Sequence, residues 1–197
     1  MTRLCLLRHA TTAWNLERRL QGRTDTPLAP EGRAEVTTWR LPPWTAGARA
    51  WTSPLLRARE TAALLGRHDA EVAPELVEMS WGIWEGRTLA ELRAADAERI
   101  AALEASGLDL MVPGGESPRA VAERIAPFLA RIAGSGGAHL AITHKGVIRA
   151  AYALASGWDM RGKPPLPLKG PMALLLEFEP DGRMRSVRLW PVVGGSG

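Results

Sequence analysis

The 197-residue sequence contains one cysteine and no apolar run long enough to cross a membrane. Cys5 has no internal disulfide partner, and its place in the apolar run 3–7 indicates a small buried side chain. The most apolar run, Met172 to Leu176, has the length of a strand, whereas a transmembrane helix needs about 18 residues. The N-terminal residues have a charge at each end of a short apolar run, which is not the pattern of a signal peptide. We therefore expect a cytoplasmic protein that does not bind membranes.

Long basic runs are also missing. The 25 Lys and Arg residues exceed the 21 Asp and Glu residues by only four charges, and lysine stands only at positions 145, 163 and 169. Arg18 and Arg19 form the only adjacent basic pair, so no run reaches the five to eight residues of a nucleic-acid-binding patch. The small positive excess favours small anionic molecules as ligands and argues against nucleic acid.

The composition is that of an ordinary globular domain, with 46% hydrophobic and 23% charged residues. Neither an internal repeat nor a linker-like segment interrupts the chain. We expect one domain over residues 1–193, followed by a flexible tail from Gly194 to Gly197.

Strand-like and helix-like segments alternate along the chain. Apolar or β-branched runs predict strands at 3–7, 48–52, 71–73, 139–143, 173–179 and 186–190. Apolar periodicity and capping residues predict helices at 30–39, 54–65, 89–103 and 146–156, and a further helix that begins after Ser117 and is kinked or divided at Pro127. In this interpretation Ser53 is the N-cap of the second helix.

This alternation predicts an α/β protein of three layers, with a mostly parallel central sheet between two layers of helices. Pro180-Asp181-Gly182 separates the last two strands and is a strong signal for an antiparallel C-terminal hairpin. The outer edge of that hairpin is a place where a homodimer could form.

Charged side chains follow three of the predicted strands. Arg8 and His9 follow the first strand, Arg57 comes soon after the second, and His144 follows the strand at 139–143. Ligands of open parallel sheets bind at the carboxyl ends of the strands, so these side chains should meet at one edge. Two guanidinium groups and two imidazoles suit a tetrahedral dianion such as a phosphoryl group.

Six segments of the chain, taken in order, resemble the motifs of the histidine phosphatase superfamily, the phosphoglycerate-mutase-like proteins. These segments are Leu7 to Asn15, Gln21-Gly22, Ser53 to Ala62, Leu76 to Gly86, Pro113 to Ser117 and Thr143 to Arg149. The resemblance covers residues 3 to about 150. It implies the phosphoglycerate-mutase-like fold, which agrees with the three-layer sandwich predicted from the pattern.

The resemblance also implies a role for each matching residue. His9 attacks phosphorus and becomes a phosphohistidine, while Arg8, Arg57 and His144 hold the phosphoryl oxygens. Glu78 protonates the leaving oxygen and then accepts a proton from water, which requires a pKa above the ordinary value of a carboxyl group.

Further residues are expected at the mouth of the site. Asn15 orients His9 or the phosphate, Gln21 and Gly22 line the mouth, and Lys145 adds a charge at the rim where many family members have glycine. No metal and no cofactor is expected, since the arginines supply the positive charge and would repel a cation between the two histidines.

Some of these residues have alternative interpretations. Glu78 is favoured over Glu85 as the acid, with Glu75 and Glu91 also nearby. Trp14, Trp81 and Trp84 are as suited to filling the core as to stacking on a substrate. His68 and His139 have no comparable placement and are expected to be ordinary.

Two activities use this set of residues. Mutases of the superfamily carry extra segments over the site and an Arg-His-Tyr run after the acid, whereas Met79-Ser80-Trp81 follows Glu78 here. We therefore expect hydrolysis of a small phosphomonoester metabolite. The alternatives are phosphoglycerate-mutase-type transfer and a non-catalytic binder of phosphorylated ligands.

Overall fold

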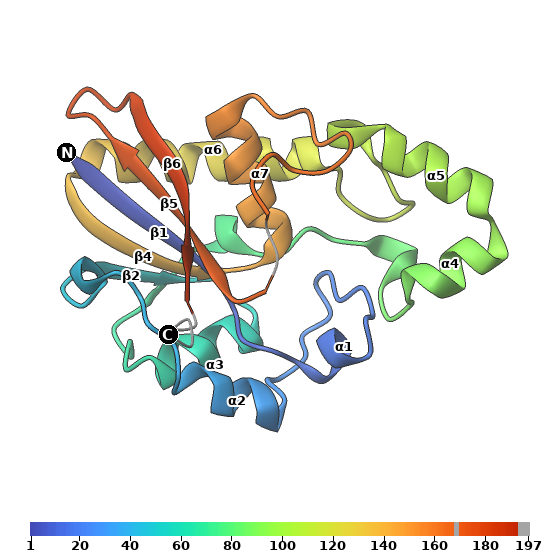
Figure 1. The fold of residues 1–197 in the computed structure, drawn as a ribbon, viewed down its shortest axis with the longest axis horizontal. Coiled ribbons are helices and arrows are strands. Elements are labelled where there is room, and N and C mark those ends of the chain that lie inside the picture. Colours follow the sequence, from blue (N-terminus) through green and yellow to red (C-terminus); the bar gives the residue numbers. More distant parts are fainter. Residues whose placement is uncertain (168–169, 193–197) are drawn as a thin grey trace.

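A six-stranded sheet runs through the computed structural model, which describes residues 1–167 and 170–192. The strands are β1 (Thr2–Arg8), β2 (Arg49–Thr52), β3 (Glu71–Val72), β4 (Gly137–Thr143), β5 (Met172–Phe178) and β6 (Met184–Pro191), in the order β3-β2-β4-β1-β5-β6. The pairs β3–β2, β2–β4 and β4–β1 are parallel. β5 pairs antiparallel with β1 and with β6, so the predicted C-terminal hairpin is present (Figure 1).

Helices cover both faces of this sheet. On one face lie α6 (Pro118–Ser135) and α7 (Lys145–Ser156), and on the other lie α2 (Pro30–Val36) and α3 (Leu56–Leu64) (Figure 1). The short helix α1 (Ala13–Leu16), together with α4 (Leu89–Ala95) and α5 (Ala97–Ala105), lies beyond one end of the sheet. The predicted three-layer α/β sandwich with a mostly parallel sheet is confirmed.

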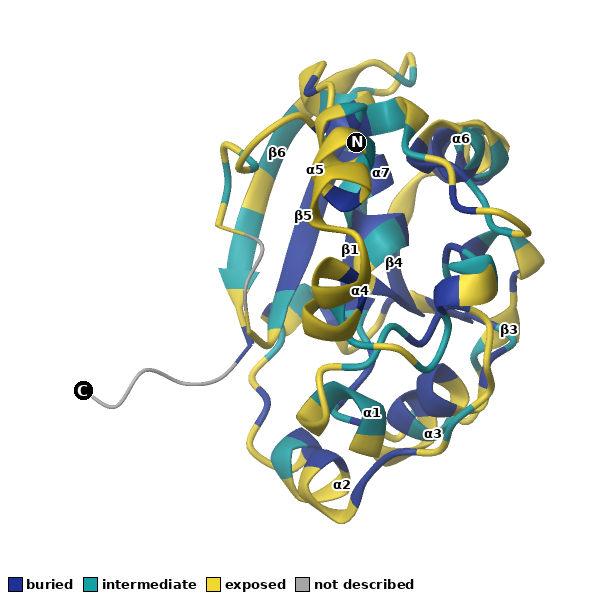
Figure 2. Cartoon of the chain, turned by 90° about the vertical axis from the view of Figure 1, so that its right-hand side faces the viewer, coloured by how far each residue is buried: buried dark blue, intermediate teal, exposed yellow. Residues whose placement is uncertain are grey.

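Successive side chains of β1 point to opposite faces of the sheet, and each face has its own hydrophobic core. Leu4 and Leu6 join the cluster under α6 and α7, whereas Cys5 and Leu7 join the cluster that contains residues of α2 and α3. All four are almost fully buried, and burial raises the pKa of the Cys5 thiol, as expected of an inert buried side chain. Figure 2 shows β1, β4 and β5 as buried strands, while much of α4 and α5 is exposed.

Several predicted boundaries were wrong. The predicted helix 89–103 is two helices, because Asp96 ends α4 and its carboxylate accepts a hydrogen bond from the Arg99 N–H at the start of α5. α2 ends at Val36 and α3 begins at Leu56, so Ser53 is not an N-cap. Ser117 caps α6 as predicted. Pro127 does not divide the helix, because α6 continues through it to Ser135. The predicted tail 194–197 lies outside the described residues.

No helix in the described ranges is both long and apolar enough to span a bilayer.

Candidate active site

The carboxyl ends of β1 and β4 bring two histidines together. The backbone N–H of His9 donates to the Thr143 carbonyl at 2.9 Å. The ring centroids of His9 and His144 lie 5.1 Å apart. Arg57, from the first turn of α3, donates from Nε to His9 Nε2 at 3.3 Å. Arg8, the last residue of β1, opens onto the same cavity as His9. The four predicted residues therefore converge as the strand order required.

The orientation of the His9 ring is set by its neighbour. Nδ1 lies 2.7 Å from the Ala10 carbonyl oxygen, which can only accept, so Nδ1 carries the proton and Nε2 carries the lone pair. Burial, with the charges of Arg8 and Arg57 in addition, holds the pKa of His9 well below its ordinary value of 6.5. His9 is therefore a neutral imidazole, and its unprotonated Nε2 accepts the hydrogen bond from Arg57.

Arg57 is held on every side although it is fully buried. Its two terminal nitrogens donate to the carbonyls of Gly22 at 2.8 Å and Thr24 at 2.9 Å. Thr61, one turn later on α3, donates to the Arg57 carbonyl and accepts from the Ala10 N–H. The helix thereby fixes both the guanidinium and the segment that carries His9.

Two buried nitrogen atoms at this site have no hydrogen-bond partner among the described residues: Arg8 Nε and His144 Nδ1. The other ring nitrogen of His144, Nε2, lies 2.7 Å from the Ser53 hydroxyl, which also accepts from the Leu55 N–H at 3.3 Å. Ser53 therefore orients His144, where the sequence pattern predicted a helix cap. Burial, followed by the interaction with His9 and the charge of Arg57, holds the pKa of His144 well below 6.5.

Glu78 is a half-buried carboxylate with few hydrogen-bond partners. It accepts from the N–H of Met79 at 2.8 Å and from that of Gly146, at the start of α7, at 3.2 Å. Burial raises the pKa of Glu78, although those two N–H groups and the charges of Arg57 and Arg8 act in the opposite sense.

Glu85 has a different environment. Its carboxylate accepts from the N–H groups of Arg23, Thr24 and Trp81 and from the hydroxyls of Thr24 and Ser80. Burial acts to raise the pKa of Glu85, but these hydrogen bonds outweigh it and the net shift is downward. Glu85 thus ties down the loop whose carbonyls hold Arg57, and it does not line the cavity.

A cavity of about 600 Å³ joins most of these groups. Its lining includes Arg8, His9, Arg57 and Glu78, the predicted binding residues Asn15, Gln21, Gly22 and Lys145, and further cations from Arg18, Arg19 and Arg149. His144 is buried beside His9 and is not part of the lining. Asn15 and Gln21 each use their side-chain oxygen locally, for Thr12 and Thr26.

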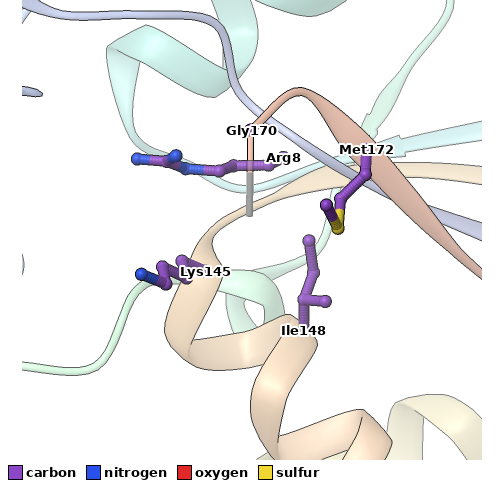
Figure 3. Close-up of a pocket in the computed structure, with 5 residues that line it drawn as sticks. All are labelled: Arg8, Lys145, Ile148, Gly170 and Met172. Atoms are coloured by element: carbon purple, nitrogen blue, oxygen red, sulfur yellow. The ribbon is translucent and has the colours of Figure 1, made fainter. Parts of the chain in front are cut away.

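A smaller hollow of about 20 Å³ adjoins Arg8. Figure 3 shows the side chains of Arg8 and Lys145 extending in the same direction, away from the apolar pair Ile148 and Met172. Ile148 belongs to the hydrophobic cluster under α6 and α7, and Met172 packs against it. The charged ends of Arg8 and Lys145 therefore point away from this core.

The remaining predicted residues are divided between core and cavity. Trp84 is buried in the cluster with Leu92 and Ile100, and Trp81 stacks against it at 6.0 Å, while both also line the cavity. His139 is buried and bonded to Trp51, and His68 is exposed. Within the described residues, no three metal-ligating side chains gather, and the charge of the cavity comes from arginine and lysine.

Sequence reasoning missed Ser53 as a site residue and did not consider Arg149. Ser53 directly follows β2, so the strand-end pattern that found His9 and His144 applied to it as well. Arg149 stands four residues after Lys145 on α7, on the same face of the helix, and this spacing was its signal.

Comparison with known proteins identifies the family of this chain. The model of the histidine phosphatase superfamily (branch 1) matches residues 4–192. A mycobacterial glucosyl-3-phosphoglycerate phosphatase, solved with VO3, shares 28% identity at a TM-score of 0.77, covering 98% of this chain and all of that one.

Curated relatives include phosphatases and mutases. A metal-independent phosphoserine phosphatase of Arabidopsis thaliana is 30% identical over 172 residues, which cover 83% of this chain and 72% of the relative. A 2,3-bisphosphoglycerate-dependent phosphoglycerate mutase of Gloeobacter violaceus is 35% identical over 131 residues, covering 63% of this chain and 60% of the relative. The family model spans nearly the whole sequence, and the chain belongs to the histidine phosphatase superfamily, branch 1.

Proposed function

We propose that this protein is a metal-independent phosphomonoester hydrolase that acts through a phosphohistidine on a small anionic metabolite. The observation that carries the proposal is the state of His9. Its Nδ1 donates to the Ala10 carbonyl, its low pKa keeps Nε2 unprotonated, and Arg57, which donates to Nε2, lines the same cavity as His9 and Arg8. A neutral, oriented imidazole beside fixed positive charge is what attack on a phosphate dianion requires.

In the first step, His9 Nε2 forms a bond to phosphorus while the bond from phosphorus to the ester oxygen breaks. Arg57, fixed by two carbonyls, and Arg8 stabilise the negative charge on the transferring oxygens. Glu78, which its raised pKa keeps protonated to a higher pH than an ordinary carboxyl, gives its proton to the leaving oxygen.

The buried donors without partners have a role in the same step. In this step the Ser53 hydroxyl, which accepts from the Leu55 N–H, donates its own hydrogen to His144 Nε2. His144 Nδ1 then carries a proton that no described residue accepts. Unpartnered polar groups are uncommon in native interiors, and a phosphoryl oxygen bound beside His9 supplies the missing acceptor.

In the second step, water attacks phosphorus, the bond to His9 Nε2 breaks, and Glu78, now ionised, takes the proton from the water. Two observations favour water over a second substrate as the acceptor. The position after Glu78 is held by the buried side chain of Met79, where mutases are expected to carry arginine. In addition, two of the relatives described above are phosphatases, one of phosphoserine and one of glucosyl-3-phosphoglycerate.

The proposal is tested by incubating the protein with 4-nitrophenyl phosphate and with 3-phosphoglycerate, each with and without EDTA. We expect release of inorganic phosphate from at least one ester, no effect of EDTA, and no release by His9→Ala. Quenching turnover in alkaline detergent should trap an acid-labile, alkali-stable phosphoryl group on the native protein and none on the variant.

Two outcomes contradict hydrolysis. Interconversion of 2- and 3-phosphoglycerate without phosphate release would establish the mutase activity. Tight binding of phosphate without turnover of any ester would indicate a non-catalytic binder.

A further inference from the structure

Arg149 is a cation of the cavity that the proposed mechanism does not use. It lies on α7, four residues after Lys145 and five after His144. Five residues of helix correspond to about 7.5 Å along the axis, so Arg149 lines the cavity at a position farther along α7 than the phosphoryl site.

The guanidinium of Arg149 is held in place without its donors being used. Its Cζ lies 5.0 Å from the centroid of the Trp158 ring, and Trp158 is itself buried and donates from its indole N–H to the Arg161 carbonyl. Stacking occupies the face of a guanidinium and leaves the N–H donors at its edge available.

Within the described residues, no acceptor bonds to these donors and no carboxylate forms an ion pair with them. The cavity contains two carboxylates: Glu78 bonds to backbone N–H groups, and Glu104 is paired with Arg93. Glu78 acts on Arg149 only as a charge at longer range, and burial lowers the pKa of Arg149. A half-buried cation without an acceptor costs free energy until an anion occupies its edge.

The charge of the cavity leads to the same conclusion. Six cationic side chains line it, namely Arg8, Arg18, Arg19, Arg57, Lys145 and Arg149, against the two carboxylates. One phosphoryl group accounts for Arg8 and Arg57. Arg19 is already bonded to Glu17 and to the Gly86 carbonyl. Arg149 is thus a fixed cation of the cavity whose N–H donors are not used by the described residues.

We propose that Arg149 is a specificity-determining residue that binds a second anionic group of the substrate, a carboxylate or a phosphoryl group a few bonds from the ester. The proposal rests on the proposed function for the first phosphoryl site. The substrate class it defines is a phosphomonoester of a short acid or of a short bisphosphate, in preference to a neutral sugar or alcohol phosphate.

The test measures binding, so that it does not depend on turnover. In a His9→Ala background, titration calorimetry compares 3-phosphoglycerate with glycerol 3-phosphate, which has a hydroxymethyl group in place of the carboxylate. A second pair compares propane-1,3-diol bisphosphate with propyl phosphate. We expect the doubly anionic ligand to bind about tenfold more tightly, or better, in at least one pair, and the pair identifies the group.

Arg149→Met keeps a long stem on Trp158 and removes the charge, and it should bring that ratio to about one. Arg19→Met is the matched control, because it also removes a cation from the lining but one whose donors are already occupied, and it should keep the ratio. Arg149→Lys retains charge without the planar fork and should give an intermediate ratio, which keeps the test valid if the Met variant does not fold.

The inference is overturned if both pairs give ratios near one in the His9→Ala background, or if Arg149→Met and Arg19→Met lower the ratio equally. Failure of the proposed function gives a different result, since the native protein would then release no phosphate while the binding ratios remain measurable.

Discussion

Two carboxylates seven residues apart show how local solvation separates their roles. Glu85 accepts five hydrogen bonds, and its pKa is lowered. Glu78 accepts two, and its pKa is raised by burial. Both carboxylates interact with the charge of Arg57. The number of N–H and O–H donors around each oxygen therefore decides which carboxylate can carry a proton and which serves as a fixed anchor.

The largest effect that tests this comparison is expected for Glu78→Gln. Without a proton to give, the variant should lose about 10²- to 10⁴-fold in kcat on esters of alkyl alcohols. The loss should be smaller on 4-nitrophenyl phosphate, whose leaving group needs less protonation. The measurement is the ratio of steady-state kcat values for the two ester classes in the native protein and in the variant.

Glu85→Gln supplies the control, since it makes the same change on the carboxylate that does not line the cavity. It should leave the alkyl-to-aryl ratio where it is in the native protein. Equal losses of Glu78→Gln on both ester classes would assign the acid role to another group.

A smaller loss of kcat is expected when the Glu78 carboxylate is kept but displaced. A Cβ built on Gly146 would overlap Oε1 of Glu78, so Gly146→Ala must displace the carboxylate or the start of α7. Because misplacing a reacting group by about 1 Å costs on the order of 100-fold, we expect a loss of about 10- to 100-fold in kcat, with the alkyl-to-aryl ratio again lowered.

Gly134→Ala is the matched variant for this experiment. Gly134 also lies in a helix, α6, and nothing lies within 4 Å of its added Cβ. It should retain full kcat and gain stability of roughly 0.5–1 kcal/mol from the higher helix propensity of alanine. If both alanine variants kept native kcat, Glu78 would not need the position that Gly146 gives it.

The general placement of the site was readable from the sequence, because it depends on topology. Parallel strands that end in Arg8-His9 and in Thr143-His144 must deliver these residues to one edge, whatever the details of packing. The order of the strands, with β4 and β1 in the middle of the sheet, was not predicted from the sequence.

The sequence was less informative where one local pattern fits two structures. Ser53-Pro54 after a strand satisfies both an N-cap and a strand-end site residue, and only the packing of His144 against Ser53 decides between them. Asp96 interrupts the apolar stripe from Leu89 to Leu103, and the pattern alone did not show that this residue ends one helix and caps the next. Spacing along the chain also does not reveal how many hydrogen-bond donors surround Glu78 and Glu85. Some of these donors come from residues 61 to 68 positions away, and the others come from neighbours.

The most subtle test of the comparison is the pH dependence of folding stability. Glu85 has a folded pKa below its ordinary value of 4.5, so its stabilising effect is present above pH 4.5 and is lost as the pH falls through the lower folded value. Glu78 has a folded pKa above 4.5, so its ionisation removes stability as the pH rises from 4.5 through the higher folded value.

Urea unfolding between about pH 3 and pH 7 should therefore show opposite changes in stability for Glu85→Gln and Glu78→Gln. Relative to the native protein, Glu85→Gln should lose more stability at neutral pH than at acid pH, whereas Glu78→Gln should compare more favourably at neutral pH. A shift of the same size at every pH in both variants would mean that the two carboxylates do not differ in their folded pKa values, and the contrast between anchor and acid would fail.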